Sequence, residues 1–222
     1  MNLDQHTKQL IVHENGTVDL NSANQSTSHY SHIHISGNES SVIDGNLKGN
    51  AYSAIYVEEG SKLDISNAAI DEFKGTFNGS DDAKLIYNFK DNATWTANTA
   101  FKDNSALVLN GEGTITVENY SNGGLSVEAG SGRVLFAKAN TRSSDAYLNK
   151  LSIGKDATVA MDGVLNVQDL VGNGGVVEMN VALGNADNGS ELGANGNDGI
   201  RVANSATGAV SLLVNDRNQL QN

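Results

Sequence analysis

Short segments of alternating apolar and polar residues recur along this chain, and a polar turn interrupts most of them near the middle. In Ile55–Ile65 (IYVEEGSKLDI), Ile55 and Val57 precede the turn, and Leu63 and Ile65 follow it. Alternation with a period of two marks a β-strand that buries one face. The segments lie at Ile11–Leu20, Ile33–Ile43, Ile55–Ile65, Leu107–Val117, Leu125–Phe136, Leu151–Met161, Leu165–Val181 and Ile200–Val214. The pattern therefore predicts an all-β chain.

The spacing of these turns predicts a repeating coil. Turn centres near Gly111 and Gly130, and near Lys155 and Gly174, lie about 20 residues apart, a spacing typical of a solenoid. The chain is then long enough for about ten rungs of roughly 20 residues. Four apolar residues of one segment also align with four of another, Leu125, Val127, Val134 and Phe136 with Leu151, Ile153, Val159 and Met161. We expect such residues to stack as ladders, for example Val127, Ile153, Val167 and Val202.

An antiparallel sandwich or barrel is the alternative architecture. Its hairpins would favour two-residue Asn-Gly turns, which Asn15-Gly16, Asn78-Gly79 and Asn122-Gly123 could supply. The in-register alignment of apolar residues favours the solenoid. Ser66–Phe73 fits either two turns of helix or a loop between rungs, and residues 66–101 break the regular pattern. We therefore expect one elongated domain with an irregular excursion near residues 66–101.

The composition narrows the class of protein. The chain has 222 residues, no Cys, no Pro, 24 Gly and 29 Asn, and a formal net charge of −12. The lack of Cys excludes a disulfide scaffold and a thiolate metal site. The acidic balance disfavours binding to nucleic acid or anionic membranes, and no apolar run is long enough to span a bilayer. Abundant Asn and Gly predict many turns of one kind with left-handed backbone angles.

The last hundred residues contain an ordered set of rung motifs. They are Leu165–Val167 (LNV), Val171–Asn180 (VGNGGVVEMN), Asp198–Gly208 (DGIRVANSATG) and Ser211–Asn215 (SLLVN). In order and spacing they resemble the C-terminal rungs of bacterial autotransporter passenger domains of the pertactin-like kind. The resemblance covers about Gly163–Asn215, and the looser rung pattern covers most of the rest.

The resemblance implies a right-handed parallel β-helix. Residues 1–120 would form the passenger stem, and residues 121–222 would be the C-terminal, autochaperone-type region that nucleates folding. The polar segment Met1–Leu10 does not read as a signal peptide, and no translocator barrel follows. We therefore expect an excised passenger piece. A chain without Cys or Pro suits threading through a narrow pore, because it forms no disulfide and has no slow prolyl isomerisation.

The same resemblance implies a location and partners. The passenger would be exported through the periplasm and outer membrane to the bacterial cell surface, or secreted. Its partners would be the host cell surface, extracellular matrix or glycans, a second copy of itself, and its own translocator barrel. We expect a structural stem that supports adhesion or self-association. The alternatives are a carbohydrate-binding or carbohydrate-active β-helix, and the stem of an autotransporter protease.

Candidate chemistry is sparse. His29, His32 and His34 could bind zinc or nickel, since His32 and His34 share a strand face, but the sequence shows no nearby carboxylate to complete the ligand set. The alternative is a solvent-facing stripe opposite inward Ile33 and Ile35. Acidic pairs Glu58-Glu59 and Asp81-Asp82 and the segment Gly193–Ile200 are weak calcium candidates, and turns explain them equally well. With no nucleophile elbow or supported carboxylate pair, we expect neither catalysis nor a cofactor.

Aromatic residues gather in the irregular region. They could form a recognition surface for glycans or a protein partner, or they could cover the core. The six residues are Phe73, Phe77, Tyr87, Phe89, Trp95 and Phe101.

Overall fold

The computed structural model describes residues 3–21, 30–66, 70–120, 124–137, 147–182 and 197–217. These residues form a parallel β-solenoid of about six turns, with no helix among them. The strand pairs described are parallel, which confirms the solenoid over the antiparallel alternative. The chain divides into two compact units. One unit comprises Met1–Lys90, Thr96–Asn110 and Gly124–Ser126, and the other comprises Asp91–Trp95, Gly111–Gly123 and Val127–Asn222.

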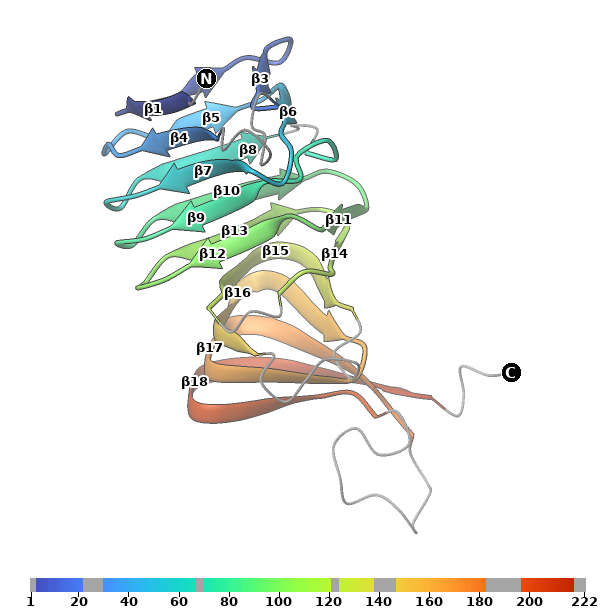
Figure 1. Ribbon diagram of the computed structural model, residues 1–222. Coiled ribbons are helices and arrows are strands. Elements are labelled where there is room, and N and C mark those ends of the chain that lie inside the picture. The colour runs from blue at the N-terminus through green and yellow to red at the C-terminus, as the bar shows by residue number, and fades with distance from the viewer. Residues whose placement is uncertain are drawn as a thin grey trace. The chain divides into compact units, whose positions relative to one another are not determined.

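Two parallel sheets form the walls of the first unit. One sheet has the order β1 (Leu3–Thr7), β4 (Ser31–Ile35), β7 (Ser53–Val57), β9 (Thr76–Gly79) and β12 (Asn98–Phe101). The other has the order β2 (Ile11–Val12), β5 (Ser41–Ile43), β8 (Lys62–Ser66), β10 (Lys84–Phe89) and β13 (Ala106–Gly111). The short strands β3 (Thr17–Asp19) and β6 (Asn46–Lys48) pair with each other. Strands of the first wall stack one above another in Figure 1.

The register of this unit repeats with a constant offset over most of its length. Ser31 lies beside Ser53, and Thr76 lies beside Asn98, so the same difference in residue number separates both pairs. Strands β9, β10 and β12 keep this register through much of the region in which the sequence suggested an irregular excursion. Ser66 ends β8, and residues 67–69 of the segment that could have been a helix lie outside the described residues.

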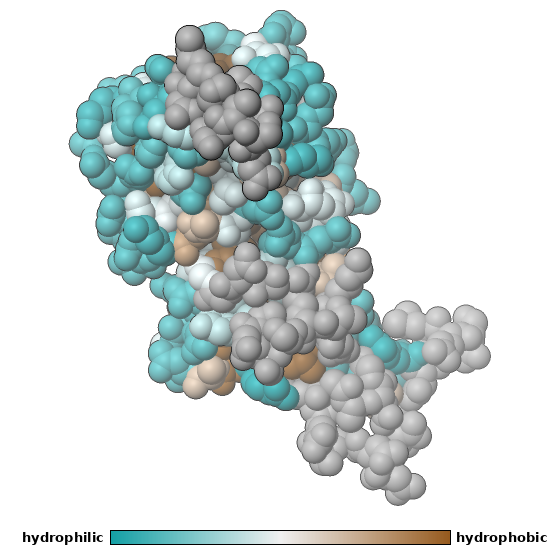
Figure 2. Space-filling view, viewed as in Figure 1, coloured by the Kyte–Doolittle hydropathy of each residue, from teal (hydrophilic) through white to brown (hydrophobic). Residues whose placement is uncertain are grey.

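Rows of apolar side chains fill the interior of the first unit. Ile33, Ile55 and Phe77 pair in register from β4 to β7 to β9, and all three are buried. Leu63 and Leu85 form a corresponding row on the opposite wall. Most outward residues of the same strands are polar, with Ile86 as an exception, and the face seen in Figure 2 is largely hydrophilic. Burial of such rows is the main stabilising term of the coil.

The turns at successive corners share one backbone conformation. Glu59, Asp81 and Asp103 have positive φ angles of 54°, 53° and 57°, and they follow each other with the same offset as the paired strands. Each turn is closed by a backbone hydrogen bond, such as the one from Ser61 N–H to the Glu58 carbonyl at 2.9 Å. The predicted repetition of left-handed turns is confirmed, although acidic residues occupy this corner where Asn and Gly were expected.

The second unit contains the four longest strands described, β15 to β18, together with two short ones. In parallel order, β11 (Ala93–Trp95) pairs with β14 (Thr114–Val117), which pairs with β15 (Ser126–Phe136), and β16 (Leu148–Met161), β17 (Val164–Val181) and β18 (Gly199–Asp216) follow.

The predicted ladder in this unit is partly wrong. Val167 does pair with Val202, but its other neighbour is Leu148, and Ile153 lies beside Gly172. Leu148 and Leu151 both point inward although an odd number of positions separates them, so the strict alternation of β16 is interrupted between them.

A bidentate ion pair ties β15 to β17 across the intervening β16. Arg133 donates from Nε to Glu178 Oε2 at 2.8 Å and from Nη2 to Oε1 at 3.2 Å. The hydrogen bond from Arg133 is the main cause that lowers the pKa of Glu178, with the Arg133 charge and a bond from Asn215 adding to it and partial burial opposing it.

We expect this pair to make stability pH-dependent. Because the folded pKa of Glu178 is lowered, its contribution is present above the ordinary value of 4.5 and is lost as pH falls through the folded pKa. Glu178→Gln should therefore cost about 0.5–1 kcal/mol at pH 7 and less at pH 3. Urea unfolding at both pH values measures this, with the exposed Glu112→Gln as the control. A cost that is equal at both pH values would contradict the assignment.

Candidate functional site

The outer face of the sheet β1–β4–β7–β9–β12 carries the candidate site. In β4, Ile33 and Ile35 point into the core, so His32 and His34 point outward, as the alternation predicted. In-register stacking then aligns equivalent outward residues of neighbouring rungs. One row runs His6, His34, Tyr56, Asn78 and Ala100.

Three rings of this row form a continuous stack. The ring centroids of His6 and His34 are 4.3 Å apart with planes 8° from parallel. Those of His34 and Tyr56 are also 4.3 Å apart, with planes 3° from parallel. His32 adds an edge contact to Tyr56 at 5.4 Å and a tilted contact to Tyr30 at 4.5 Å. The face therefore presents a rigid aromatic surface beside polar groups.

Two carboxylates hold His34 from opposite sides. His34 Nε2 lies 3.1 Å from Asp4 Oδ1, and Nδ1 lies 3.2 Å from Glu58 Oε1. Asp4 also lies 3.6 Å from His6 Nε2. The imidazole is thus fixed in orientation between β1 and the end of β7.

His32, the third histidine on this face, has a lowered pKa. Burial is the main cause that lowers the pKa of His32, Asp4 opposes it, and His34 adds to the lowering. His32 is therefore protonated less readily than an ordinary histidine, and a neutral imidazole keeps one ring nitrogen that can accept a hydrogen bond or bind a cation.

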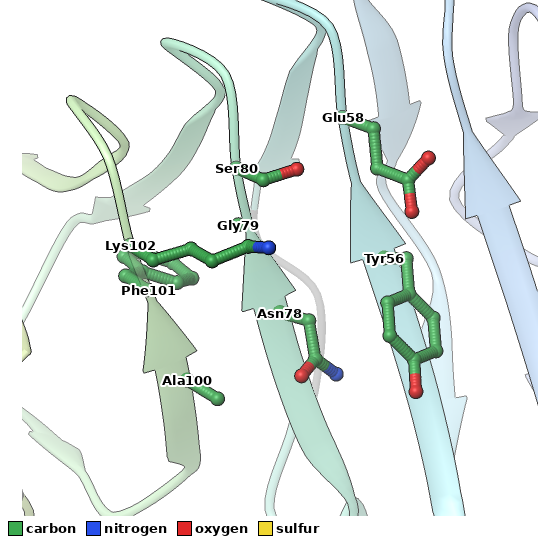
Figure 3. A pocket seen from close by; sticks show the side chains of 8 residues that line it. All are labelled: Tyr56, Glu58, Asn78, Gly79, Ser80, Ala100, Phe101 and Lys102. Carbon is green, nitrogen blue, oxygen red and sulfur yellow. The ribbon is translucent and has the colours of Figure 1, made fainter.

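A hollow of about 410 Å³ continues the face towards β12. In Figure 3, Tyr56, Asn78 and Ala100 lie on neighbouring strands, and Glu58, Ser80 and Lys102 lie just beyond the strand ends.

Gly79 helps to shape the hollow. A Cβ atom there would lie 2.9 Å from the Phe101 ring, so glycine is what admits the ring. The hollow thus combines two aromatic rings with a carboxylate, an amide, a hydroxyl and an ammonium group.

The structure brings together only part of the predicted histidine site. His32 and His34 do share a face, whereas His29 lies outside the described residues. The expectation that no nearby carboxylate completes the set is wrong, because Asp4 forms a group with His32 and His34 whose ligand atoms lie within 4.8 Å of one another. Asp4 lies a whole rung before His32, its partner in the strand pairing, so only the strand register reveals it.

The predicted aromatic recognition surface is not a surface. Phe73, Phe77, Phe89, Trp95 and Phe101 are at most 6% exposed.

The sixth ring is also largely covered. Tyr87 pairs with the buried Ile65, and its burial raises its pKa, with Asp71 adding to the effect. Of these six rings only Phe101 lines the hollow, and the outward rings of this face are instead the partly exposed ones of β4 and β7 and the histidine of β1.

The acidic pairs and the Gly193–Ile200 segment, which were the calcium candidates, gain no support from the structure as a calcium site. Glu59, Asp81 and Asp82 occupy left-handed turn positions, which explains their place in the sequence. Residues 193–196 of the Gly193–Ile200 segment lie outside the described residues. Its Asp198 is buried, and its carboxylate accepts hydrogen bonds from Gly163 and Asn180 within the second unit.

The class of protein follows from this geometry. The chain is a parallel β-solenoid with an outward aromatic and polar face. No protein-family model, curated protein or solved structure gives a significant match to it. Within the described part of the chain, no helix has the length and apolar character needed to cross a bilayer.

Proposed function

We propose that this chain is a surface-exposed β-solenoid stem that supports adhesion by binding glycans on its flat face. The observation that carries the proposal is the hollow beside the ring stack. Binding sites for small polar ligands combine apolar or aromatic walls with a few placed polar groups. The Tyr56 ring offers a face for the C–H side of a sugar, and Glu58, Asn78 and Lys102 offer acceptors and donors for its hydroxyls.

Several features of the hollow suit an oligosaccharide. It is open along the rungs, and its lining comes from three successive strands that are held in fixed register. Asn78 and Glu58 are only partly exposed, so a ligand there would cost little further side-chain entropy. The Lys102 ammonium forms no ion pair among the described residues, which leaves its donors available to a ligand.

The proposal extends to the parent protein through sequence resemblance. The motifs within Gly163–Asn215 support an autotransporter passenger with a right-handed coil, displayed at the bacterial surface or secreted. Host cell surface, matrix and its own translocator barrel are the partners that this origin implies. Self-association, a carbohydrate-active role and a protease stem stay predictions, and we expect no catalysis from this chain itself.

A glycan microarray followed by calorimetry tests the binding function. We expect the purified chain to retain a group of related oligosaccharides, and Tyr56→Ala to weaken the best of them tenfold or more, because the stacking face is lost. Tyr56→Phe should keep most of the affinity. Tyr52→Ala removes an exposed tyrosine outside the hollow and serves as the control. Absence of binding across the array, or equal affinity in Tyr56→Ala, would reject the proposal.

A further inference from the structure

We propose that Asp4, His32 and His34 form a binding site for a divalent cation of the zinc type that clamps β1 to β4. The three residues come from two rungs, Asp4 from β1 and both histidines from β4. Imidazole nitrogen and carboxylate oxygen are ligands that zinc takes readily. None of the three residues lines the hollow, and the inference does not depend on glycan binding.

The spacing of the ligand atoms fits a small tetrahedral ion. Zinc lies about 2.0–2.2 Å from nitrogen and oxygen ligands, so two ligands of one tetrahedron are about 3.3 Å apart. Asp4 Oδ1 and His34 Nε2 are 3.1 Å apart, and no pair in the group of three exceeds 4.8 Å. Small side-chain rotations bring such atoms to coordinating distance. Three protein ligands leave the fourth position to water.

A second observation points to the same ion. His34 Nδ1 lies 3.2 Å from Glu58 Oε1, so with the proton on Nδ1 the ring donates a hydrogen bond to Glu58, and the lone pair of Nε2 points towards Asp4. Metal-bound histidines usually carry such an outer carboxylate, which fixes the ring and raises its basicity. The parallel His6 and Tyr56 rings on either side of His34 hold its plane further. His34 is therefore oriented before any ion binds, and Glu58 is a positioning residue.

Cation binding would have a mechanical consequence for the coil. β1 is the end strand of its sheet, and it pairs only with β4 in the sheet order. An ion shared by Asp4 and the two histidines adds a cross-link between these rungs. Because the ion binds the folded arrangement, it should also stabilise that arrangement by mass action.

Zinc titration of the untagged chain tests the site. We expect one equivalent of Zn²⁺ to bind, measured by competition with a chromophoric chelator, and amide hydrogen exchange in β1 to slow when zinc is present. His32→Gln, His34→Gln and Asp4→Asn should each weaken binding at least tenfold. His13→Gln removes an exposed histidine outside the group and should leave the affinity unchanged.

Glu58→Gln separates positioning from ligation. We expect roughly a tenfold loss of affinity with unchanged stoichiometry, and a changed imidazole tautomer of His34 in ¹⁵N spectra of the zinc-free chain. Circular dichroism checks that every variant keeps its fold. The inference fails if zinc does not saturate a single site, if His13→Gln weakens binding as much as His34→Gln does, or if zinc leaves β1 exchange unchanged in the wild type.

Discussion

Phe77→Ala is expected to lower the free energy of unfolding of the first unit by about 3–5 kcal/mol. Phe77 lies in β9, is fully buried, and packs against Phe73 with ring centroids 4.8 Å apart. Truncation removes apolar burial and leaves a cavity, because the in-register neighbour Ile55 is fixed by the ladder and cannot move to fill it. Urea unfolding followed by circular dichroism measures the loss.

A matched truncation on the surface is the control for the unfolding free energy of Phe77→Ala. Ile11 lies in β2 of the same unit and is 53% exposed, so Ile11→Ala should change stability by no more than about 0.5 kcal/mol. A loss below about 1 kcal/mol for Phe77→Ala would contradict a core role. The result also decides between the two roles proposed for this ring from sequence, since a recognition residue would cost binding and leave stability intact.

Asp198→Ala should destabilise the second unit by about 3 kcal/mol or more. The Asp198 carboxylate accepts from Gly163 N–H at 2.8 Å and from Asn180 N–H at 3.0 Å. It also accepts from the Asn180 side-chain amide at 2.9 Å and lies 3.3 Å from Arg217 Nη2. The side chain is fully buried, so its loss leaves the Gly163 N–H donor buried without an acceptor. The variant would also lose the hydrogen bonds by which one carboxylate connects the start of β17 to its end.

The neighbouring Asp162 provides the control for this variant. Its side chain is exposed, so Asp162→Ala should stay within about 0.5 kcal/mol of the wild type. Asp198→Asn should fall between the two, since the amide keeps one oxygen and places donors where donors already point. Thermal unfolding of the three variants ranks them. Equal stability of Asp198→Ala and Asp162→Ala would show that the carboxylate anchors nothing.

In the regularly alternating strands, the face on which a residue lies could be predicted because alternation is a local property. Ile33 and Ile35 inward and His32 and His34 outward follow from a period of two. The prediction of a recognition surface from the aromatic residues between Phe73 and Phe101 did not use this alternation, and it was wrong. These rings interrupt the aliphatic pattern of the sequence, whereas β9 and β12 continue the rungs with phenylalanine in place of aliphatic residues. An aromatic ring at an inward position of a strand belongs to the core, whatever residues surround it in the sequence.

Pairing between rungs is not a local property. Asp4 pairs with His32 and His32 pairs with Ala54, so the first rung is longer than the second. A first rung of the same length as the second would have placed Asp4 beside another residue. Likewise, the shift between Gly154 and Gly174 changes which residues of β16 and β17 are neighbours. Loop length and bulges set these offsets, and neither alters the alternation that the sequence displays.

The sequence by itself therefore determined the all-β class, the stacked coil, the repeated left-handed turns and the face on which residues of the regularly alternating strands lie. These depend on φ/ψ preference and on the period of apolar residues, which adjacent residues encode. Only the tertiary structure decided which side chains of different rungs meet: Asp4 with His34, Glu58 with His34, and Asp198 with Gly163 and Asn180. Such contacts depend on the register between rungs, where a single inserted residue moves every neighbour to another partner.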